Sequence, residues 1–127
     1  MEKQLTLKEM IAPYWSPEHN GVVIPLLNKV LDLKNLSDQP RNRWENTELA
    51  KQADKEWITN EDFHILYWQR NEINEILAEH GGDLLIGWFG TSTECSDYYC
   101  WIVNFGSGIC NFTLVINSYV GRGLVAL

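Results

Sequence analysis

The sequence lacks both a long apolar stretch and a basic cluster. A membrane-spanning helix needs roughly 20 consecutive apolar residues, and no stretch approaches that length. Lys and Arg number 10 against 17 Asp and Glu, and the sequence pI is near 4.8. Because phosphate contacts need clustered Lys and Arg, this balance argues against nucleic acid as a partner, and equally against an anionic membrane surface.

Cysteine is scarce as well. Cys95, Cys100 and Cys110 are odd in number and lack the spacing of metal ligands, so they indicate no disulfide framework. Residues 1–12 contain no basic region followed by an apolar run and a small-residue cleavage site. We therefore expect reduced thiols in a cytoplasmic protein.

The chain also lacks a catalytic motif. Glu61 and His64 have the spacing of a metal-binding pair on a helix, but a carboxylate-bridged site needs a second such pair, and the sequence has none. The glycine-rich stretches 106–108 and 121–123 are short and indicate hairpin turns, not phosphate loops. We expect no enzyme activity, no catalytic residues, no metal and no cofactor.

What is present suffices for a folded core. The chain has 127 residues, of which 45% are apolar and 12% aromatic, and disorder requires lower hydrophobicity than this. Domains commonly run about 100–150 residues. We expect a single domain over residues 1–127.

Helical patterns dominate the first 82 residues. Thr6 and Glu9 form the S/T-x-x-E capping box that begins a helix. Pro40 and its polar surroundings predict a loop over 34–46, which Trp44 would fix to the core. Apolar spacing and caps predict helices from Leu7 to before Pro13, from Val22 through Leu31, over 48–57, and over about 60–80, the last ending at Gly81-Gly82.

After Gly82 the apolar period changes from 3.6 to 2, which is typical of strands. Strands are predicted over 83–89, 98–105 and 109–117, with turns at 90–93 and 106–108, and 119–127 adds either a short fourth strand or an apolar tail. The predicted fold class is α+β. Helices of 1–82 would pack on one face of a three- to four-stranded antiparallel sheet formed by 83–127.

Charge is concentrated in one segment. Residues 54–83 hold eight acids and two bases, so they carry −6 of the net −7. At about 100° per residue, one arc of roughly 80° on the predicted 60–80 helix collects Glu61, His64, Trp68, Glu72, Glu75 and Glu79. We call these six residues the acidic face. An exposed tryptophan among carboxylates is typical of a docking face for a basic protein, and a solvated face without a partner is the alternative.

The opposite side of the same helix predicts its core contacts, which are Phe63, Leu66, Tyr67, Ile73 and Leu77. Arg70 falls within this apolar arc, and a buried unpaired guanidinium is too costly to expect. Either Arg70 extends outward to solvent or it meets an acid from another element, and we predict the second, a paired and mostly buried Arg70.

Aromatic residues mark a second candidate surface. Six tryptophans are more than a core of this size explains. In the predicted strand 98–105, Trp101 shares a face with Tyr99, Val103 and Phe105, while the other face is also apolar. The strand is then either covered on both sides or partly exposed for binding.

In size, acidity, surplus tryptophan and the Trp68–Glu79 stripe, the chain resembles the immunity proteins of bacterial polymorphic and contact-dependent growth inhibition toxin systems. The resemblance implies binding to a cognate toxin, often a nuclease, with occlusion of its active site. Glu61, Glu72, Glu75 and Glu79 would imitate phosphates, and Trp68 would be the anchor. Alternatives are a virus-encoded inhibitor of a host nuclease and a small-ligand or regulatory module that uses the aromatic sheet.

Overall fold

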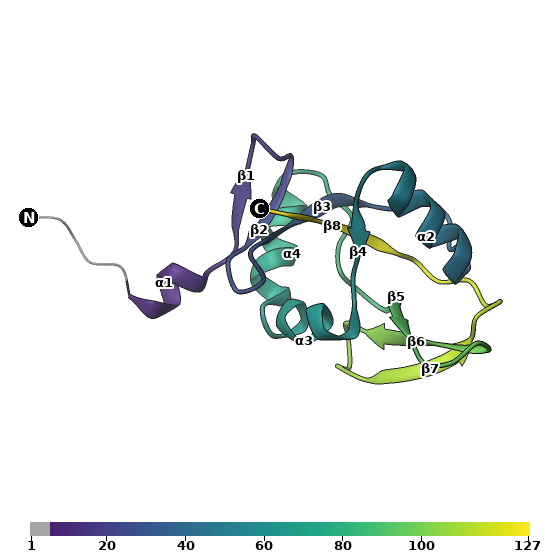
Figure 1. The fold of residues 1–127 in the computed structure, drawn as a ribbon. Helices are drawn as coiled ribbons and strands as arrows, with labels where there is room; N and C mark the ends of the chain where they lie inside the picture. The colour runs from purple at the N-terminus through teal and green to yellow at the C-terminus, as the bar shows by residue number, and fades with distance from the viewer. Residues whose placement is uncertain (1–5) are drawn as a thin grey trace, which may run out of the picture.

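The computed structural model describes residues 6–127, which form two antiparallel sheets with four helices around them (Figure 1). The larger sheet has the order β1 (Tyr14–Ser16), β2 (Gly21–Ile24), β3 (Lys29–Asn35), β8 (Arg122–Ala126) and β4 (Glu56–Trp57). The smaller sheet has the order β5 (Trp88–Glu94), β6 (Tyr99–Asn104) and β7 (Cys110–Leu114). The helices are α1 (Leu7–Ile11), α2 (Arg43–Gln52), α3 (Asn60–Trp68) and α4 (Arg70–Glu79).

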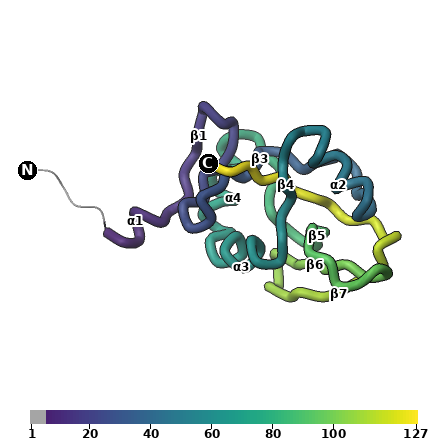
Figure 2. The backbone as a smooth tube through the Cα atoms, in the orientation of Figure 1, coloured from purple at the N-terminus to yellow at the C-terminus, as the bar shows by residue number. Residues whose placement is uncertain are grey.

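The predicted α+β class is confirmed, but the predicted division of the chain is wrong. Four strands, β1 to β4, lie within residues 1–82, so that part is not a helical half packed on a later sheet. Residues 83–127 do not form one three- to four-stranded sheet either. Their last strand, β8, enters the larger sheet between β3 and β4, as the yellow end of the chain in Figure 2 shows.

The segment from Val22 to Leu31 is a β-hairpin and not the predicted helix. All four residues of β2 are buried, so the strand shows no alternation that would reveal a period of 2. Pro25 opens the turn, and Asn28 adopts a positive φ of 52°, which Asn tolerates better than most residues. The apolar spacing that indicates a helix here arises from two buried strands on either side of a turn.

The predicted 34–46 loop is too long, because α2 begins at Arg43. The Asn42 side chain accepts a hydrogen bond from the Glu45 N–H, and the Glu45 carboxylate accepts one from the Asn42 N–H. This is a capping box with Asn in place of Ser or Thr. Trp44 is 53% exposed, so it does not fix this segment to the core.

The predicted 60–80 helix is two helices that meet at Gln69. Backbone angles of φ −102° and ψ 14° at Gln69 interrupt the helix, and α4 turns away from α3 (Figure 1). α3 contacts β5 and β6, whereas α4 contacts β1 and β2. The bend therefore lets one short segment cover both sheets, which a straight helix does not do.

The strand predicted over 83–89 begins later. Residues 83–87 have no regular structure and are held to α4 by two hydrogen bonds between Asn74 and the Leu85 backbone. β5 begins at Trp88 and includes residues 90–93, which were predicted as a turn. The prediction of a strand at 98–105 and of a turn at 106–108 is confirmed by β6 and the connection that follows it.

One hydrophobic core joins the two sheets. Phe105 of the small sheet makes edge-to-face contacts with Phe63 of α3, at 5.0 Å between ring centres, and with Phe89 of β5, at 5.2 Å. Four of the five core residues predicted on the 60–80 helix are fully buried, and Tyr67 is half-buried. The core cluster consists of Val22, Ile24, Leu31, Ile58, Phe63, Leu66, Ile73, Leu77, Leu85, Phe89, Val103, Phe105 and Leu124.

The buried arginine of this protein is Arg122, which has no exposed surface. The pairing of β3 with β8 shifts register between Leu31 and Asn35. Arg122 donates from Nε to the Asp32 carbonyl at 2.7 Å, from Nη2 to the Leu33 carbonyl at 2.9 Å, and from Nη1 to Asn35 Oδ1 at 2.9 Å. The guanidinium therefore supplies donors to β3 where the strand ladder is irregular.

Arg70 is not the buried ion pair that its helical position predicts. Its guanidinium lies 3.9 Å from the centre of the Tyr67 ring and donates to the Tyr67 carbonyl at 2.9 Å. The side chain is partly exposed, so a cation–π contact and a solvent-facing edge replace the expected carboxylate partner.

We expect Arg122→Met to lower the free energy of unfolding by about 3 kcal/mol or more, because each buried acceptor left without a donor costs about 1–3 kcal/mol. Arg70→Met is the matched control and should cost about 1 kcal/mol or less, as an exposed cation–π contact does. Urea denaturation followed by circular dichroism measures both. Equal losses for the two variants would contradict the assigned role of Arg122.

Candidate functional site

All six residues of the acidic face are exposed. Glu61, His64 and Trp68 lie on α3, and Glu72, Glu75 and Glu79 lie on α4. The single helical arc that the sequence predicts is therefore divided at Gln69. One half lies on α3 and the other on α4, and the two helix axes run in different directions. Trp68 is the last residue of α3 and is 64% exposed, so it stands at the bend between the two halves.

The carboxylates of residues 54–83 fall into two groups. Glu56 and Asp62 form ion pairs with Lys29 at 3.6 and 3.2 Å, and Asp83 lies 4.0 Å from Lys34. Within the described residues 6–127, the four glutamates of the acidic face, like Asp54, form no ion pair. Internal cations thus neutralise other acids of the segment but leave the acidic face charged.

A hollow of about 340 Å³ adjoins the bend and is bordered by Leu7, Lys8, Ile11, Trp68, Gln69 and Glu72. Gln69 is nearly buried and donates from Nε2 to the Ile11 carbonyl at 3.0 Å, which ties α1 to the bend. Trp68 and Glu72 therefore face two apolar side chains of α1, Leu7 and Ile11, and one cation, Lys8, across a depression. Helical periodicity could not indicate this contact, since α1 lies far away in the sequence.

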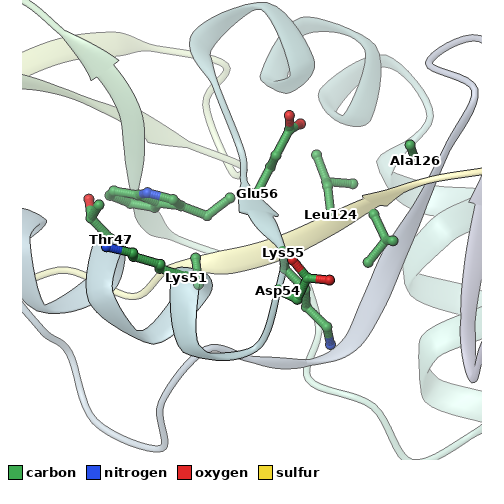
Figure 3. A pocket seen from close by; sticks show the side chains of 10 residues that line it. Thr47, Lys51, Asp54, Lys55, Glu56, Leu124 and Ala126 are labelled. Carbon is green, nitrogen blue, oxygen red and sulfur yellow. The ribbon is translucent and has the colours of Figure 1, made fainter.

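A larger cleft of about 520 Å³ opens between α2 and the β4–β8 edge (Figure 3). Its lining residues are Thr47, Ala50, Lys51, Asp54, Lys55, Glu56, Trp57, Leu124, Val125 and Ala126. Its charges have both signs, and Lys55 is already bonded to Asp32 at 2.8 Å. The lining contains neither His nor Cys, so it offers no imidazole base and no thiol nucleophile. Because its lining comes from α2, β4 and β8, no local pattern in the sequence indicates this cleft.

The small sheet exposes a second candidate surface, formed by Tyr99, Trp101, Phe112 and Leu114, which we call the aromatic face. Phe112 contacts Tyr99 and Trp101 edge-to-face, with ring centres 5.5 and 5.9 Å apart. Strand register places all four side chains on one side. Trp88 is paired with Asn104 and so points to the opposite side, away from Trp101.

The apolar side of strand β7 lies largely outside the core. Cys110, Phe112 and Leu114 do share one side of the strand, as alternation predicts, but Phe112 and Leu114 are exposed. The reason is that α3 covers β5 and β6 but does not extend over the far end of β7. The apolar side of this strand is therefore surface.

All three cysteines are free thiols, as predicted. Cys95 is exposed, Cys100 buried and Cys110 half-buried. Burial raises the pKa of Cys100. The positive charge of Arg43 partly offsets this rise, and nearby Cys95 adds to it. Burial also raises the pKa of Cys110. A raised pKa keeps a thiol protonated and therefore unreactive.

Within residues 6–127, no three His, Cys, Asp or Glu side chains gather as they would around a metal ion. Over the same range no helix combines the length and apolar character needed to cross a membrane. No protein-family profile matches the chain, and no curated protein matches it either.

Thiol chemistry should separate the three cysteines. We expect three thiols per denatured chain under non-reducing conditions and one that reacts quickly in the folded protein, with the others at least about tenfold slower because they are protonated and shielded. A chromogenic disulfide reagent measures both counts. Cys95→Ser should remove the fast phase alone. A denatured count near one would contradict the assignment of free thiols.

Proposed function

We propose that this chain is an inhibitory binding protein of the immunity type, which neutralises a cognate basic toxin, such as a nuclease, in the cytoplasm. The proposal rests on four exposed glutamates without ion-pair partners on α3 and α4, and on the exposed Trp68, which shares a hollow with one of them, Glu72. Folded proteins usually place opposite charges near one another on their surfaces. A concentration of unneutralised charge beside an aromatic side chain fits a partner of opposite charge.

In this proposal the acidic face acts by occupancy and not by catalysis. The carboxylates attract the partner's Lys and Arg side chains over a distance and so accelerate encounter. They then take the positions that substrate phosphates hold in a nuclease. Trp68 supplies the large, rigid contact area that resists dissociation. Its place beside the 340 Å³ hollow gives the partner a recess in which to seat a side chain.

The bend at Gln69 shapes this interface. Because α3 and α4 run in different directions, Glu61 and Glu79 do not belong to one straight edge. A partner that contacts both helices must fit around the α3–α4 corner, with Trp68 at its apex. The proposal therefore favours a concave basic surface, such as an active-site cleft, over a flat one.

Binding kinetics against a cognate basic toxin domain, to be sought in the gene that neighbours the one for this chain, would test the proposal. Trp68→Ala should weaken binding by at least about 2 kcal/mol, roughly 30-fold, mainly through faster dissociation. Reversal of Glu72, Glu75 and Glu79 to Lys should slow association and flatten or invert its salt dependence.

Matched control variants distinguish an effect of the acidic face from an effect of the net charge of the protein. Glu18→Lys, Asp38→Lys and Glu48→Lys together change the net charge equally at exposed positions elsewhere, and Trp44→Ala removes a comparably exposed tryptophan from α2. These controls should leave most of the binding intact, and circular dichroism should show a folded protein throughout. If acidic-face and control variants bind alike, or none changes either rate constant, the acidic face is only solvated surface.

A further inference from the structure

Strand β7 forms an open edge of the small sheet and lies at the border of the molecule (Figure 1). Within residues 6–127 it pairs on one side with β6, in five regular pairs from Tyr99–Leu114 to Val103–Cys110. The Asn104 N–H donates to the Ile109 carbonyl, and the Val115 N–H donates to the Tyr98 carbonyl, both at 2.9 Å. In an antiparallel ladder such bonded pairs alternate with unbonded ones, so residues 110, 112 and 114 direct their backbone groups away from β6.

The outward positions of β7 carry apolar side chains. Phe112 and Leu114 are 53% and 43% exposed, and cross-strand pairing sets them against Trp101 and Tyr99. An antiparallel sheet with one solvated face normally turns polar side chains to water. Here the aromatic face is solvated, and the polar Asn111 and Thr113 point to the opposite side.

This edge lacks the usual protection against pairing. Natural edge strands carry Lys, Pro or a bulge that blocks another strand. The chain has no charged residue and no proline from Tyr98 to Gly121, and the β6–β7 register has no shift. Two outward backbone groups already have partners within the chain. The Phe112 N–H donates to Oδ1 of its neighbour Asn111 at 2.8 Å, and the exposed Asn111 side chain can rotate away. The Leu114 carbonyl accepts from the Asn117 N–H at 3.0 Å, and its second lone pair can accept another donor.

We propose that β7 pairs with β7 of a second copy of this chain, antiparallel about a two-fold axis, so that two three-stranded sheets become one six-stranded sheet. The outward groups of β7 fall on even-numbered positions only. An antiparallel alignment that sets even positions opposite one another satisfies donors and acceptors on both chains, and the alignment with Phe112 opposite Phe112 pairs all three even positions of β7. It also continues the aromatic face across the axis, which is the self-complementarity that an isologous interface requires.

The absence of charged residues on β7 favours a second copy of this chain over a basic protein as the partner at this edge. A basic protein meets no carboxylate on β7, whereas two copies bring no like charges together there. The acidic helices stay apart as well. β6 and β6 of the partner copy would be separated by three strand spacings, about 14 Å, and α3 lies over β5 and β6. That separation exceeds the roughly 8 Å over which charges interact at physiological salt.

Sedimentation velocity across a range of concentrations tests the proposal with the unmodified chain. We expect a monomer–dimer equilibrium with a micromolar dissociation constant, and slower hydrogen exchange at the Phe112 and Leu114 amides as concentration rises. A chain that stays monomeric at about 1 mM would overturn the proposal, and so would a dimer whose formation leaves exchange at both amides unchanged.

Charged variants locate the interface. Phe112→Lys should raise the dimer dissociation constant at least about tenfold, because like charges then face each other across the axis. Ser107→Lys adds the same charge in the β6–β7 turn and should have little effect. A mixture of Phe112→Lys and Phe112→Glu chains should form a heterodimer more readily than either variant pairs with itself. Equal effects of Phe112→Lys and Ser107→Lys, or no preference in the mixture, would refute β7 pairing.

Discussion

The larger sheet depends on one buried guanidinium. The irregular stretch of β3 leaves the carbonyls of Asp32 and Leu33 without regular partners on β8, and Arg122 reaches across to both. Burial lowers the pKa of Arg122 to about 10, although the negative charges of Asp83 and Asp32 raise it. The group therefore stays charged near neutral pH, and its acceptors offset the cost of removing it from water.

The neighbours of Arg122 extend this role. Its own carbonyl accepts a hydrogen bond from the Ile58 N–H at 3.0 Å, which fixes the segment after β4. A Cβ atom added to Gly123 would collide with the Asp32 carboxylate, so a larger residue there would displace this carboxylate from its bond to Lys55. Gly121-Arg122-Gly123 thus leads into strand β8 and packs against β3. It does not form the hairpin turn that its composition indicates.

The features that could be predicted from the sequence are those that local interactions determine. The Thr6 cap, the apolar side of α3 and α4, strand β6 and its glycine turn follow from neighbours a few residues apart. The hairpin over 21–35 was missed because both of its strands are buried, so alternation is lost. Arg122 was missed because its acceptors lie up to 90 positions earlier in the chain, a distance at which periodicity carries no information.

The candidate site was predictable in composition but not in shape. Exposure of all six acidic-face residues agrees with their helical phase, since charged side chains avoid burial wherever a helix leaves them a choice. The division of that face at Gln69 was not predictable, because it arises from the need to cover two sheets at once. The solvated apolar side of β7 has the same origin, since alternation shows which residues share a face but not whether another element covers it.

The position of β8 also has a consequence for biosynthesis. β8 lies in the interior of the larger sheet, between β3 and β4. The larger sheet therefore cannot be completed until Arg122–Ala126 have left the ribosome. Until then β3 and β4 each present an open edge, and the pairings that remain to be made are long-range, which slows folding. A nascent chain stalled before Arg122 would therefore be exposed to aggregation and in need of a chaperone.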